Sequence, residues 1–410
     1  MEVKIINDRP VKIWTDNVEE SAMRQIENLT TLPFLFHHLA IMPDVHAGMG
    51  MPIGGVLACN DAVIPNAVGV DIGCGMCAVK TSWKLENITP EVLRKKIMRG
   101  IRKRIPLGMD HHKEPQDEAY LPTGHDIDKT VIVKQRHISI TKEVGTLGGG
   151  NHFIEIDRAT DGGLYLIIHT GSRNLGKQVA EYYQQLAVEL NQGREDYFKK
   201  RDALIAEYKA AGRRGEIQAA LKELRWNEKP LTIPEDLCYV YGTYLEDYLH
   251  DVEICQQFAR RNREMIAEIL LSRSGLSGGE AFHTVHNYID TREMILRKGA
   301  IAAHKGEKVL IPINMRDGSV LAIGRGNPDW NYSAPHGAGR LMSRNTARQT
   351  LDMAAYENAM QGIYTTSVNP ATLDEAPMAY KSLEDIIGVI QDSVDVVDVM
   401  KPVYNFKAAD

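Results

Sequence analysis

The stretch VIPNAVGVDIGCGMCAV, residues 63–79, is central to the interpretation of this chain. An apolar run enters a glycine loop here, and a second apolar run leaves it. Asp71 and Cys74 lie in that loop, three residues apart, with Gly73 between them and Gly75 after them. Because glycine adopts backbone angles that other residues resist, a carboxylate and a thiol at this spacing can point at one spot. We therefore predict that the loop forms half of a metal site.

Length, charge and cysteine content narrow the class of protein. The 410 residues suit one large domain or a few ordinary ones, and the net charge of −6 gives no overall basic character. Any contact with nucleic acid must therefore come from a local patch. The five cysteines are a sparse, odd set, which argues against a disulfide framework and predicts a reducing compartment, the cytoplasm. No apolar run reaches membrane-spanning length, so we expect no membrane contact.

Periodicity along the chain predicts both strands and helices. The patterns indicate strands within 1–15, 143–156 and 164–169, and helices over 18–31, 90–104, 177–192, 342–361 and 383–399, before a short tail ending in Lys407. Residues 106–135 are rich in loops. Residues 194–270 are helical and heavily charged, which predicts a protruding insertion packed mainly by its own apolar stripe. Its basic residues form either a solvated structural arm or a contact to nucleic acid.

Four of the fourteen histidines share one context, because each lies at a strand end or in a glycine-rich turn: His152, His169, His286 and His336. A lone histidine in such a place is usually structural, so the repeated context carries the argument. Borderline-soft divalent metals take imidazole, thiolate and carboxylate ligands. We therefore expect these histidines to complete the site begun by Asp71 and Cys74. The pairs at 37–38 and 111–112 lack this context, and we interpret them as surface or structural residues.

Two other motifs near this site were weighed. The Cys74–Cys77 spacing matches CxxC, but a strand pattern follows it, where a thioredoxin-like motif needs a helix. A structural zinc site would need a second cysteine pair. Residues 171–178, GSRNLGKQ, fit a phosphate-binding loop between a strand and a helix, but Gln178 stands where Ser or Thr would hold magnesium. The helix start beside Arg173 still suits a phosphate.

Eight segments, in order, resemble the RtcB family of RNA ligases across nearly the whole chain: PDVHAG, VGVDIGCGM, GTLGGGNHFIEI, HTGSR, HNY, RKGA, HGAGR and PMAYK. The resemblance implies a single α+β domain over residues 1–410 with a deep central metal cleft. The helical insertion predicted at 194–270 would lie within this domain. It also implies joining of RNA 3′-phosphate or 2′,3′-cyclic phosphate ends to 5′-hydroxyl ends. GTP and two manganese ions would be the cofactors, and a histidine–GMP adduct and an RNA-3′-pp-5′-G end the intermediates.

The motifs also imply roles for individual residues. Five positions resemble the ligands of the two manganese ions, which Cys74 would bridge: Asp71, Cys74, His152, His169 and His286. His336 resembles the nucleophile that takes up GMP, and Asp44 resembles the residue that orients its ring. The positions expected to hold the guanylate are Asn151, Glu155, Asn287, Asn314, His336, Gly337, Ala338, Gly339, Tyr380 and Lys407. Arg173 and Arg340 match arginines near the phosphates.

One segment departs from the family pattern. A P-G-S-M-G sequence typical of the family reads Pro312–Arg316, PINMR, in this chain. Arg316 then either supplies a phosphate contact or restricts which RNA ends fit. Together with longer charged helices around 194–230 and a shorter 106–140 segment, this departure favours a divergent bacterial paralogue. We hypothesise that it serves RNA repair rather than tRNA splicing.

The residues leave three functions open. The first is the GTP- and manganese-dependent ligase, which the metal and nucleophile positions favour. The second is a metal-dependent phosphodiesterase that opens cyclic phosphates on RNA without ligation, which the altered 312–316 segment favours. The third is a nucleic-acid chaperone without catalysis, against which the complete set of metal-binding and nucleophilic residues argues.

Overall fold

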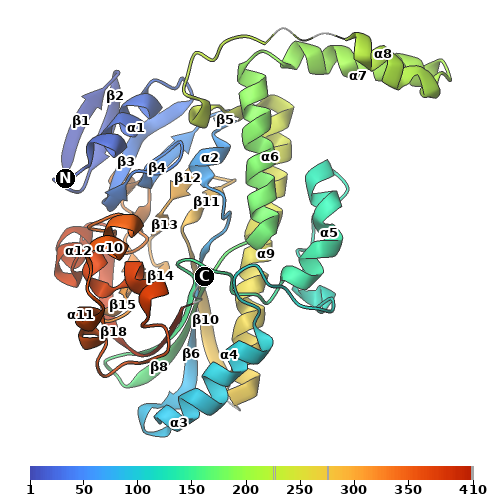
Figure 1. The fold of residues 1–410 in the computed structure, drawn as a ribbon. Coiled ribbons are helices and arrows are strands. Elements are labelled where there is room, and N and C mark those ends of the chain that lie inside the picture. The colour runs from blue at the N-terminus through green and yellow to red at the C-terminus, as the bar shows by residue number, and fades with distance from the viewer. Residues whose placement is uncertain (225, 227, 275–276, 408–410) are drawn as a thin grey trace.

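A computed structural model shows the chain built on two β-sheets flanked by helices, and it describes residues 1–224, 226, 228–274 and 277–407 (Figure 1). The first sheet has the order β1 (Glu2–Ile6), β2 (Arg9–Ile13), β3 (Leu35–His46), β4 (Ile53–Cys59), β12 (Ile295–Lys298), β11 (Asn287–Asp290). The second has the order β10 (Gly278–Val285), β6 (Gly75–Lys84), β8 (Gly163–Thr170), β7 (Phe153–Arg158), β18 (Val394–Lys407), β15 (Gly318–Gly324), β14 (Lys308–Asn314), with β17 (Tyr364–Thr365) paired to β18. The mixture of sheets and helices confirms the α+β class.

Two short ribbons and a set of helices complete the fold. The ribbons pair β13 (Ala300–Ala302) with β16 (Ser333–Pro335) and β5 (Ala62–Val63) with β9 (Val240–Tyr241). The helices are α1 (Glu20–Thr30), α2 (Pro65–Val68), α3 (Pro90–Val92), α4 (Arg99–Arg104), α5 (Val131–Glu143), α6 (Arg173–Asn191), α7 (Glu195–Ala210), α8 (Ile217–Glu223), α9 (Gly242–Ser274), α10 (Arg344–Thr350), α11 (Met353–Ala359) and α12 (Leu383–Ile390). Among the residues described, no helix combines the length and the apolar character that crossing a bilayer requires.

The longest helix, α9, belongs to the core. It packs against α6 and against β6 and β8 of the second sheet. Its side chains Cys255, Phe258 and Ile266 are fully buried, at the helical spacing that one apolar face produces. Residues 194–270 therefore do not form a single protruding arm, because their second half lies inside the molecule.

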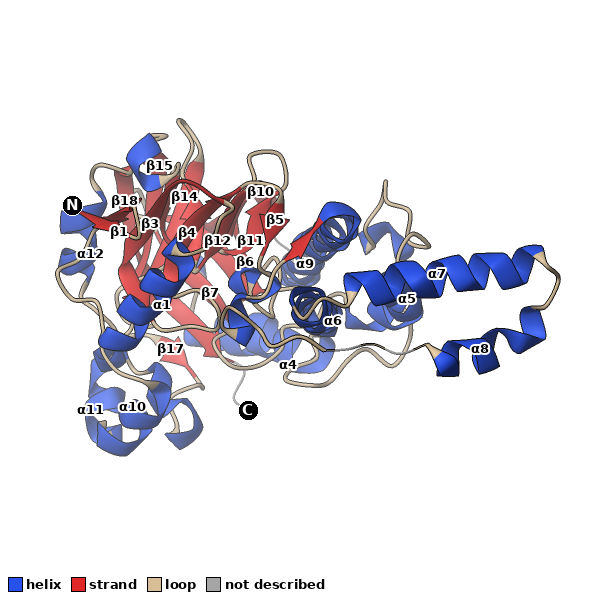
Figure 2. Cartoon of the chain, turned by 90° about the horizontal axis from the view of Figure 1, so that it is seen from above, coloured by secondary structure: helices blue, strands red, loops and turns tan. Residues whose placement is uncertain are grey.

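Helices α7 and α8 form the part that projects from the body, as both views show (Figures 1 and 2). Phe198 is the buried side chain of α7, and the Arg194 guanidinium lies over the Phe198 and Trp226 rings. These cation–π contacts join the two ends of the projection at its base, and the Phe198 ring also lies beside Tyr244 of α9. The interpretation of this projection as an inserted segment stays a prediction.

The C-terminal region differs from the sequence-based expectation. The helix predicted over 383–399 ends at Ile390, and the predicted tail is the strand β18, which lies between β7 and β15. The reason is visible in residues 394–399, VDVVDV, whose near alternation suits a strand better than a helix. The helix predicted over 342–361 is divided into α10 and α11, because Asp352 caps the start of α11.

Candidate active site

Four adjacent strand ends of the second sheet bring the predicted metal ligands together. Strand β6 begins directly after Cys74, β7 begins directly after His152, and β8 ends one residue after His169. In the register of the sheet, Gly75 faces both Thr170 and Val285, so these ends are level. His286 is the single residue between β10 and β11, where the chain passes from one sheet to the other.

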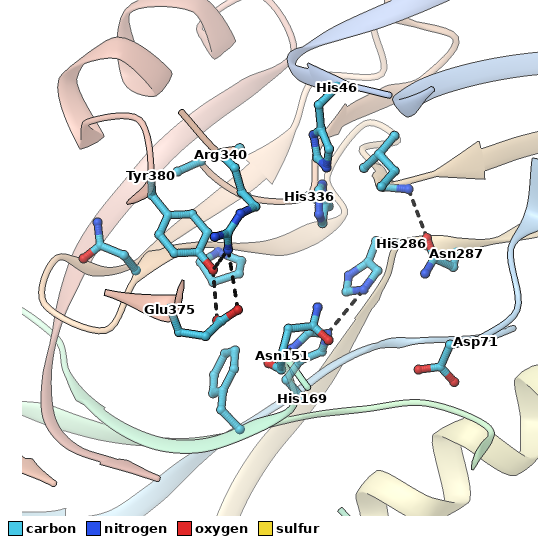
Figure 3. A pocket seen from close by; sticks show the side chains of 18 of the residues that line it. His46, Asp71, Asn151, His169, His286, Asn287, His336, Arg340, Glu375 and Tyr380 are labelled. Carbon is cyan, nitrogen blue, oxygen red and sulfur yellow. Dashed lines mark hydrogen bonds and ion pairs between the residues drawn. The ribbon is translucent and has the colours of Figure 1, made fainter. Parts of the chain in front are cut away.

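The donor atoms of Cys74, His152 and His169 lie within 4.8 Å of one another, and His286 adds a fourth donor in contact with His169. The Cys74 Sγ atom lies 3.4 Å from Nε2 of His152 and 3.4 Å from Nε2 of His169. Nε2 of His169 lies 3.3 Å from Nε2 of His286 (Figure 3). A thiol and several imidazoles cannot all satisfy one another by hydrogen bonds, whereas a divalent cation accepts all of them as ligands. The donor set therefore fits a metal ion such as manganese or zinc.

Backbone carbonyls orient two of these imidazoles. Nδ1 of His152 lies 2.9 Å from the Leu147 carbonyl oxygen, and Nδ1 of His169 lies 3.2 Å from the Asn151 carbonyl oxygen. Each carbonyl fixes the proton on Nδ1 and leaves the Nε2 lone pair directed into the cluster. Burial and the neighbouring imidazoles lower the pKa of His169 well below its usual value, which favours the neutral form that binds metals.

Asp71 contacts the cluster through His152. Its Oδ2 lies 3.0 Å from Nε2 of His152, and its Oδ1 accepts a hydrogen bond of 3.1 Å from the Ser172 backbone N–H. Burial alone would raise the pKa of Asp71, but His152, Cys74 and Arg173 together outweigh it and lower that pKa. Gly171 is required here, because a Cβ atom at that position would lie 2.1 Å from Asp71 Oδ1. Asp71 is thus held as a carboxylate that can bind a metal.

The pKa of the Cys74 thiol is shifted in the opposite direction from that of Asp71. Burial, reinforced by the Asp71 carboxylate, raises the pKa of Cys74 well above its usual range. A coordinated divalent cation reverses that preference, because it stabilises the thiolate directly. Metal binding would therefore release a proton from Cys74.

His336 lies directly beside the predicted metal ligands. It follows β16 directly, and its ring centroid lies 5.1 Å from that of His286. Its Nδ1 lies 2.7 Å from Oδ2 of Asp44, whose side chain is fully buried in β3. A proton held on Nδ1 by this carboxylate leaves the Nε2 lone pair free for reaction. His46, beside His336 in Figure 3, also lines this cavity.

A cavity of about 430 Å³ extends from the metal cluster past His336 to a second group of polar residues. Arg340 donates a hydrogen bond of 3.0 Å to the Tyr380 hydroxyl, which in turn donates one of 2.9 Å to Glu375. Lys407 also contacts Glu375. Burial alone would raise the pKa of Glu375, but the cations Lys407 and Arg344 outweigh it and lower that pKa to about 2. An aromatic ring with fixed charges beside it suits a purine base.

The sequence matches one protein family over nearly its whole length. The family model described as tRNA-splicing ligase RtcB matches residues 25–138 and 123–408. The chain belongs to the RtcB family of RNA ligases. It is 30% identical to the RNA-splicing ligase RtcB of Escherichia coli K12, over 98% of each chain. It is 26% identical to the tRNA-splicing ligase RtcB of Thermococcus kodakarensis, over 94% of this chain and 90% of that one.

In this RtcB-family chain, most of the residues expected from the motifs line one cavity. They are Asp71, Asn151, Glu155, His169, His286, Asn287, Asn314, His336, Gly337, Ala338, Gly339, Arg340, Tyr380 and Lys407. Cys74, His152 and Asp44 lie directly behind its wall, in contact with lining residues. The structure thus brings the expected set together, while the role of each residue stays a prediction.

Two of the arginines expected near the phosphates, Arg173 and Arg316, do not line the cavity, although Arg173 is close enough to Asp71 to lower its pKa. Arg173 donates hydrogen bonds to the Thr146 hydroxyl and the Gly108 carbonyl, at 3.1 and 2.8 Å. Arg316 forms a bidentate ion pair with Asp317, with N–O distances of 2.9 and 2.8 Å. It does not line the cavity. Asn314 also binds Asp317, through Nδ2 at 2.8 Å. In this conformation the 312–316 segment, which differs from the family pattern, bonds to the neighbouring Asp317, and Arg316 is not available to a ligand in the cavity.

The motif interpretation of this RtcB-family chain did not include several residues that position the site. Arg263 of α9 is fully buried and donates hydrogen bonds of 2.8 Å to the carbonyl oxygens of Gly73 and Thr170. Asn262 donates to the Gly171 carbonyl at 3.1 Å and accepts from the Gly145 and Thr146 N–H groups. Their signal is present in the sequence, because they interrupt the apolar stripe of α9 at helical spacing. Glu375, which gathers the cations at the far end of the cavity, has no such periodic signal.

Proposed function

We propose that this protein seals RNA ends, joining a 3′-phosphate or 2′,3′-cyclic phosphate end to a 5′-hydroxyl end with GTP as the cosubstrate. The observation that carries the proposal is the pairing of His336 with Asp44, directly beside the cluster of metal-binding side chains. A neutral imidazole oriented by a buried carboxylate is an activated nucleophile. The similarity to proteins named as RNA-splicing ligases supplies RNA as the polymer.

The first chemical step is attack of His336 Nε2 on the α-phosphorus of GTP. An N–P bond forms, and pyrophosphate leaves. The ring gains positive charge as the bond forms, and Asp44, hydrogen-bonded to Nδ1, stabilises that charge. We place the guanine base at the far end of the cavity, where Tyr380 offers an aromatic face and Glu375 and Glu155 offer carboxyl groups.

Two transfers follow. An oxygen of the RNA 3′-phosphate attacks the phosphorus of the histidine adduct, which breaks the N–P bond and yields an RNA-3′-pp-5′-G end. The 5′-hydroxyl oxygen of the second RNA end then attacks the phosphorus of the 3′-phosphate, which forms the phosphodiester and expels GMP. A cyclic phosphate must first be opened by water to a 3′-phosphate.

Asp71, Cys74, His152, His169 and His286 are the residues that would hold the metal, which we propose to be two manganese ions. When bound, such ions neutralise phosphate oxygens and assist departure of the leaving group. The four donors of Cys74 and the three histidines suit borderline-soft metals, and Asp71 adds an oxygen ligand. Zinc competes for such a site, so metal availability decides which ion is bound.

Incubation with GTP labelled at the α-phosphate, followed by denaturing electrophoresis, tests the proposal. Label that stays on the protein, is released by acid but not by base, and is absent from a His336→Ala variant supports it. The altered 312–316 segment favours the second candidate, a cyclic phosphodiesterase without ligation. An unlabelled protein that still opens a 2′,3′-cyclic phosphate would establish that candidate instead.

A further inference from the structure

A basic stretch lies outside the cavity described above. Between residues 94 and 104 the chain carries seven cations and no acid: Arg94, Lys95, Lys96, Arg99, Arg102, Lys103 and Arg104. The net charge of the whole chain is −6, so this concentration is local. Arg102, Lys103 and Arg104 are exposed, and none of them forms an ion pair with a carboxylate in the part of the chain that the structure describes.

The buried side of the same segment fixes the direction of these cations. Ile97, Ile101 and Ile105 recur at every fourth position and are 0–2% exposed. They belong to the same core cluster as Ile266 and Leu270 of α9, which lies beside α4 (Figure 1). Because one face of the helix is anchored to α9, its last turn presents the basic side chains to solvent at a defined place.

These cations line a groove of about 780 Å³. The loop that follows α4 forms the other side of the groove and contributes His111, His112 and Lys113, while Met265 and Ile269 of α9 form apolar lining. Asp110 is the acidic residue in the lining. The groove therefore combines a cationic wall, which suits a phosphate backbone, with an apolar surface that can contact sugars or bases.

The groove is joined to the metal-binding loop by backbone hydrogen bonds. The Gly108 N–H donates to the Gly148 carbonyl at 2.9 Å, and the Leu147 N–H donates to the Pro106 carbonyl at 3.0 Å. Residues 149–152 follow at once and carry the metal-binding histidine, His152. A polymer whose end occupies the metal cluster would thus meet this basic groove close to that end.

We propose that the groove binds the phosphate backbone of the RNA strand whose 3′-phosphate end reaches the metal cluster. The inference rests on the proposed RNA-sealing function and adds where the substrate strand lies. Arginine side chains bind phosphate through paired N–H donors, and a lysine beside them adds a point charge. The apolar lining from α9 contacts bases or sugars without selecting a sequence.

The test compares strand lengths by fluorescence anisotropy, with a labelled single-stranded RNA bearing a 3′-phosphate and no GTP, so that sealing cannot occur. A strand of about 12 nucleotides should bind the wild-type protein more tightly than one of about 3, because only the longer strand spans the groove. In the triple variant Arg102→Ala, Lys103→Ala, Arg104→Ala, binding of the longer strand should weaken at least tenfold, to roughly the level of the shorter one. The slope of log affinity against log salt concentration should become shallower by about 2, because each of the three lost phosphate contacts contributes about 0.7.

A matched variant removes the same number of charges from the projecting helices: Lys200→Ala, Lys209→Ala, Lys222→Ala. It should bind the longer strand like the wild type, and both variants should unfold at the wild-type temperature. If the groove variant does not fold, the double variant His111→Ala, Lys113→Ala on the facing loop replaces it. This double variant should also bind the longer strand more weakly than the wild type does. The proposal is overturned if strand length does not matter in the wild type, or if the two triple variants lose equal affinity. Guanylylation of the wild-type protein, measured without RNA, reports separately on the proposed sealing function.

Discussion

Nδ1 of His336 lies 2.7 Å from Oδ2 of Asp44, although the two residues are 292 positions apart in the chain. The second oxygen of Asp44, Oδ1, is buried with no hydrogen-bond partner among the described residues. Asp44 is thus committed to His336, and a buried carboxylate with a single partner acts mainly by fixing the tautomer and orientation of that partner.

Replacement of the Asp44 carboxylate should therefore disturb the orientation of the His336 ring without affecting metal binding. In Asp44→Asn we expect the rate of GMP transfer to the protein to fall by about 10²–10⁴-fold, because the amide no longer fixes the proton on Nδ1. The bound metal content should not change. Asp329→Asn, which alters an exposed carboxylate paired with Lys12, is the matched control. A normal rate in Asp44→Asn would show that the histidine needs no orienting group.

The bridging role expected for Cys74 makes a prediction about metal stoichiometry. Cys74→Ala should lose both ions after dialysis against manganese, because a bridging thiolate serves two sites at once. Cys77 is equally buried, lies three residues along the chain, and packs in the apolar core. Cys77→Ala should therefore keep the wild-type metal content, measured by elemental analysis. One fully retained ion in Cys74→Ala would contradict the bridge.

Arg263 should stabilise the metal-binding loops from behind. In Arg263→Met the carbonyl oxygens of Gly73 and Thr170 lose buried charge-assisted hydrogen bonds, so the free energy of unfolding should fall by about 2–5 kcal/mol. Metal affinity should fall as well, because these carbonyls adjoin Cys74 and His169. Arg260→Met, at an exposed position of the same helix, should change the unfolding free energy by about 0.5 kcal/mol or less. Urea denaturation of the two metal-free variants checks the difference, and equal losses would refute the role of Arg263.

Glu155 should make stability depend on pH. Burial raises the pKa of Glu155 from 4.5 to about 7, although hydrogen bonding from Asn405 opposes the shift. The folded protein therefore holds a proton that the unfolded chain releases, and the unfolding free energy should fall as pH rises from about 4.5 to about 7.

The variant Glu155→Gln cannot ionise and should not show this contribution. Its unfolding free energy relative to the wild type should rise across the same pH window, in urea denaturation of protein free of metal and GTP. Glu280→Gln, at an exposed position paired with Lys308, is the control. Because Lys308 lowers the pKa of Glu280, its contribution changes mainly below the window, and the variant should keep the wild-type slope between about pH 5 and 7. Parallel profiles for the wild type and Glu155→Gln would show that the carboxyl is ionised throughout.

The sequence alone identified the side chains that could bind a metal or act as a nucleophile in this protein. The glycine loop with Asp71 and Cys74, and the histidines at strand ends, could be recognised because spacing and residue type follow from local backbone geometry. The helix boundaries near the C-terminus could not be recognised in this way. Residues 394–399 form a strand because β7 and β15 pair with β18 on either side, which the local pattern does not reveal.

Tertiary structure decided which of these groups meet. Cys74, His152, His169 and His286 converge because four neighbouring strands of one sheet have level ends, which depends on pairing between segments up to about two hundred residues apart. The same long-range packing buried Arg263 behind Cys74 and placed Asp44 against His336. Burial and partner choice are properties of the whole fold, and no local pattern in the chain encodes them.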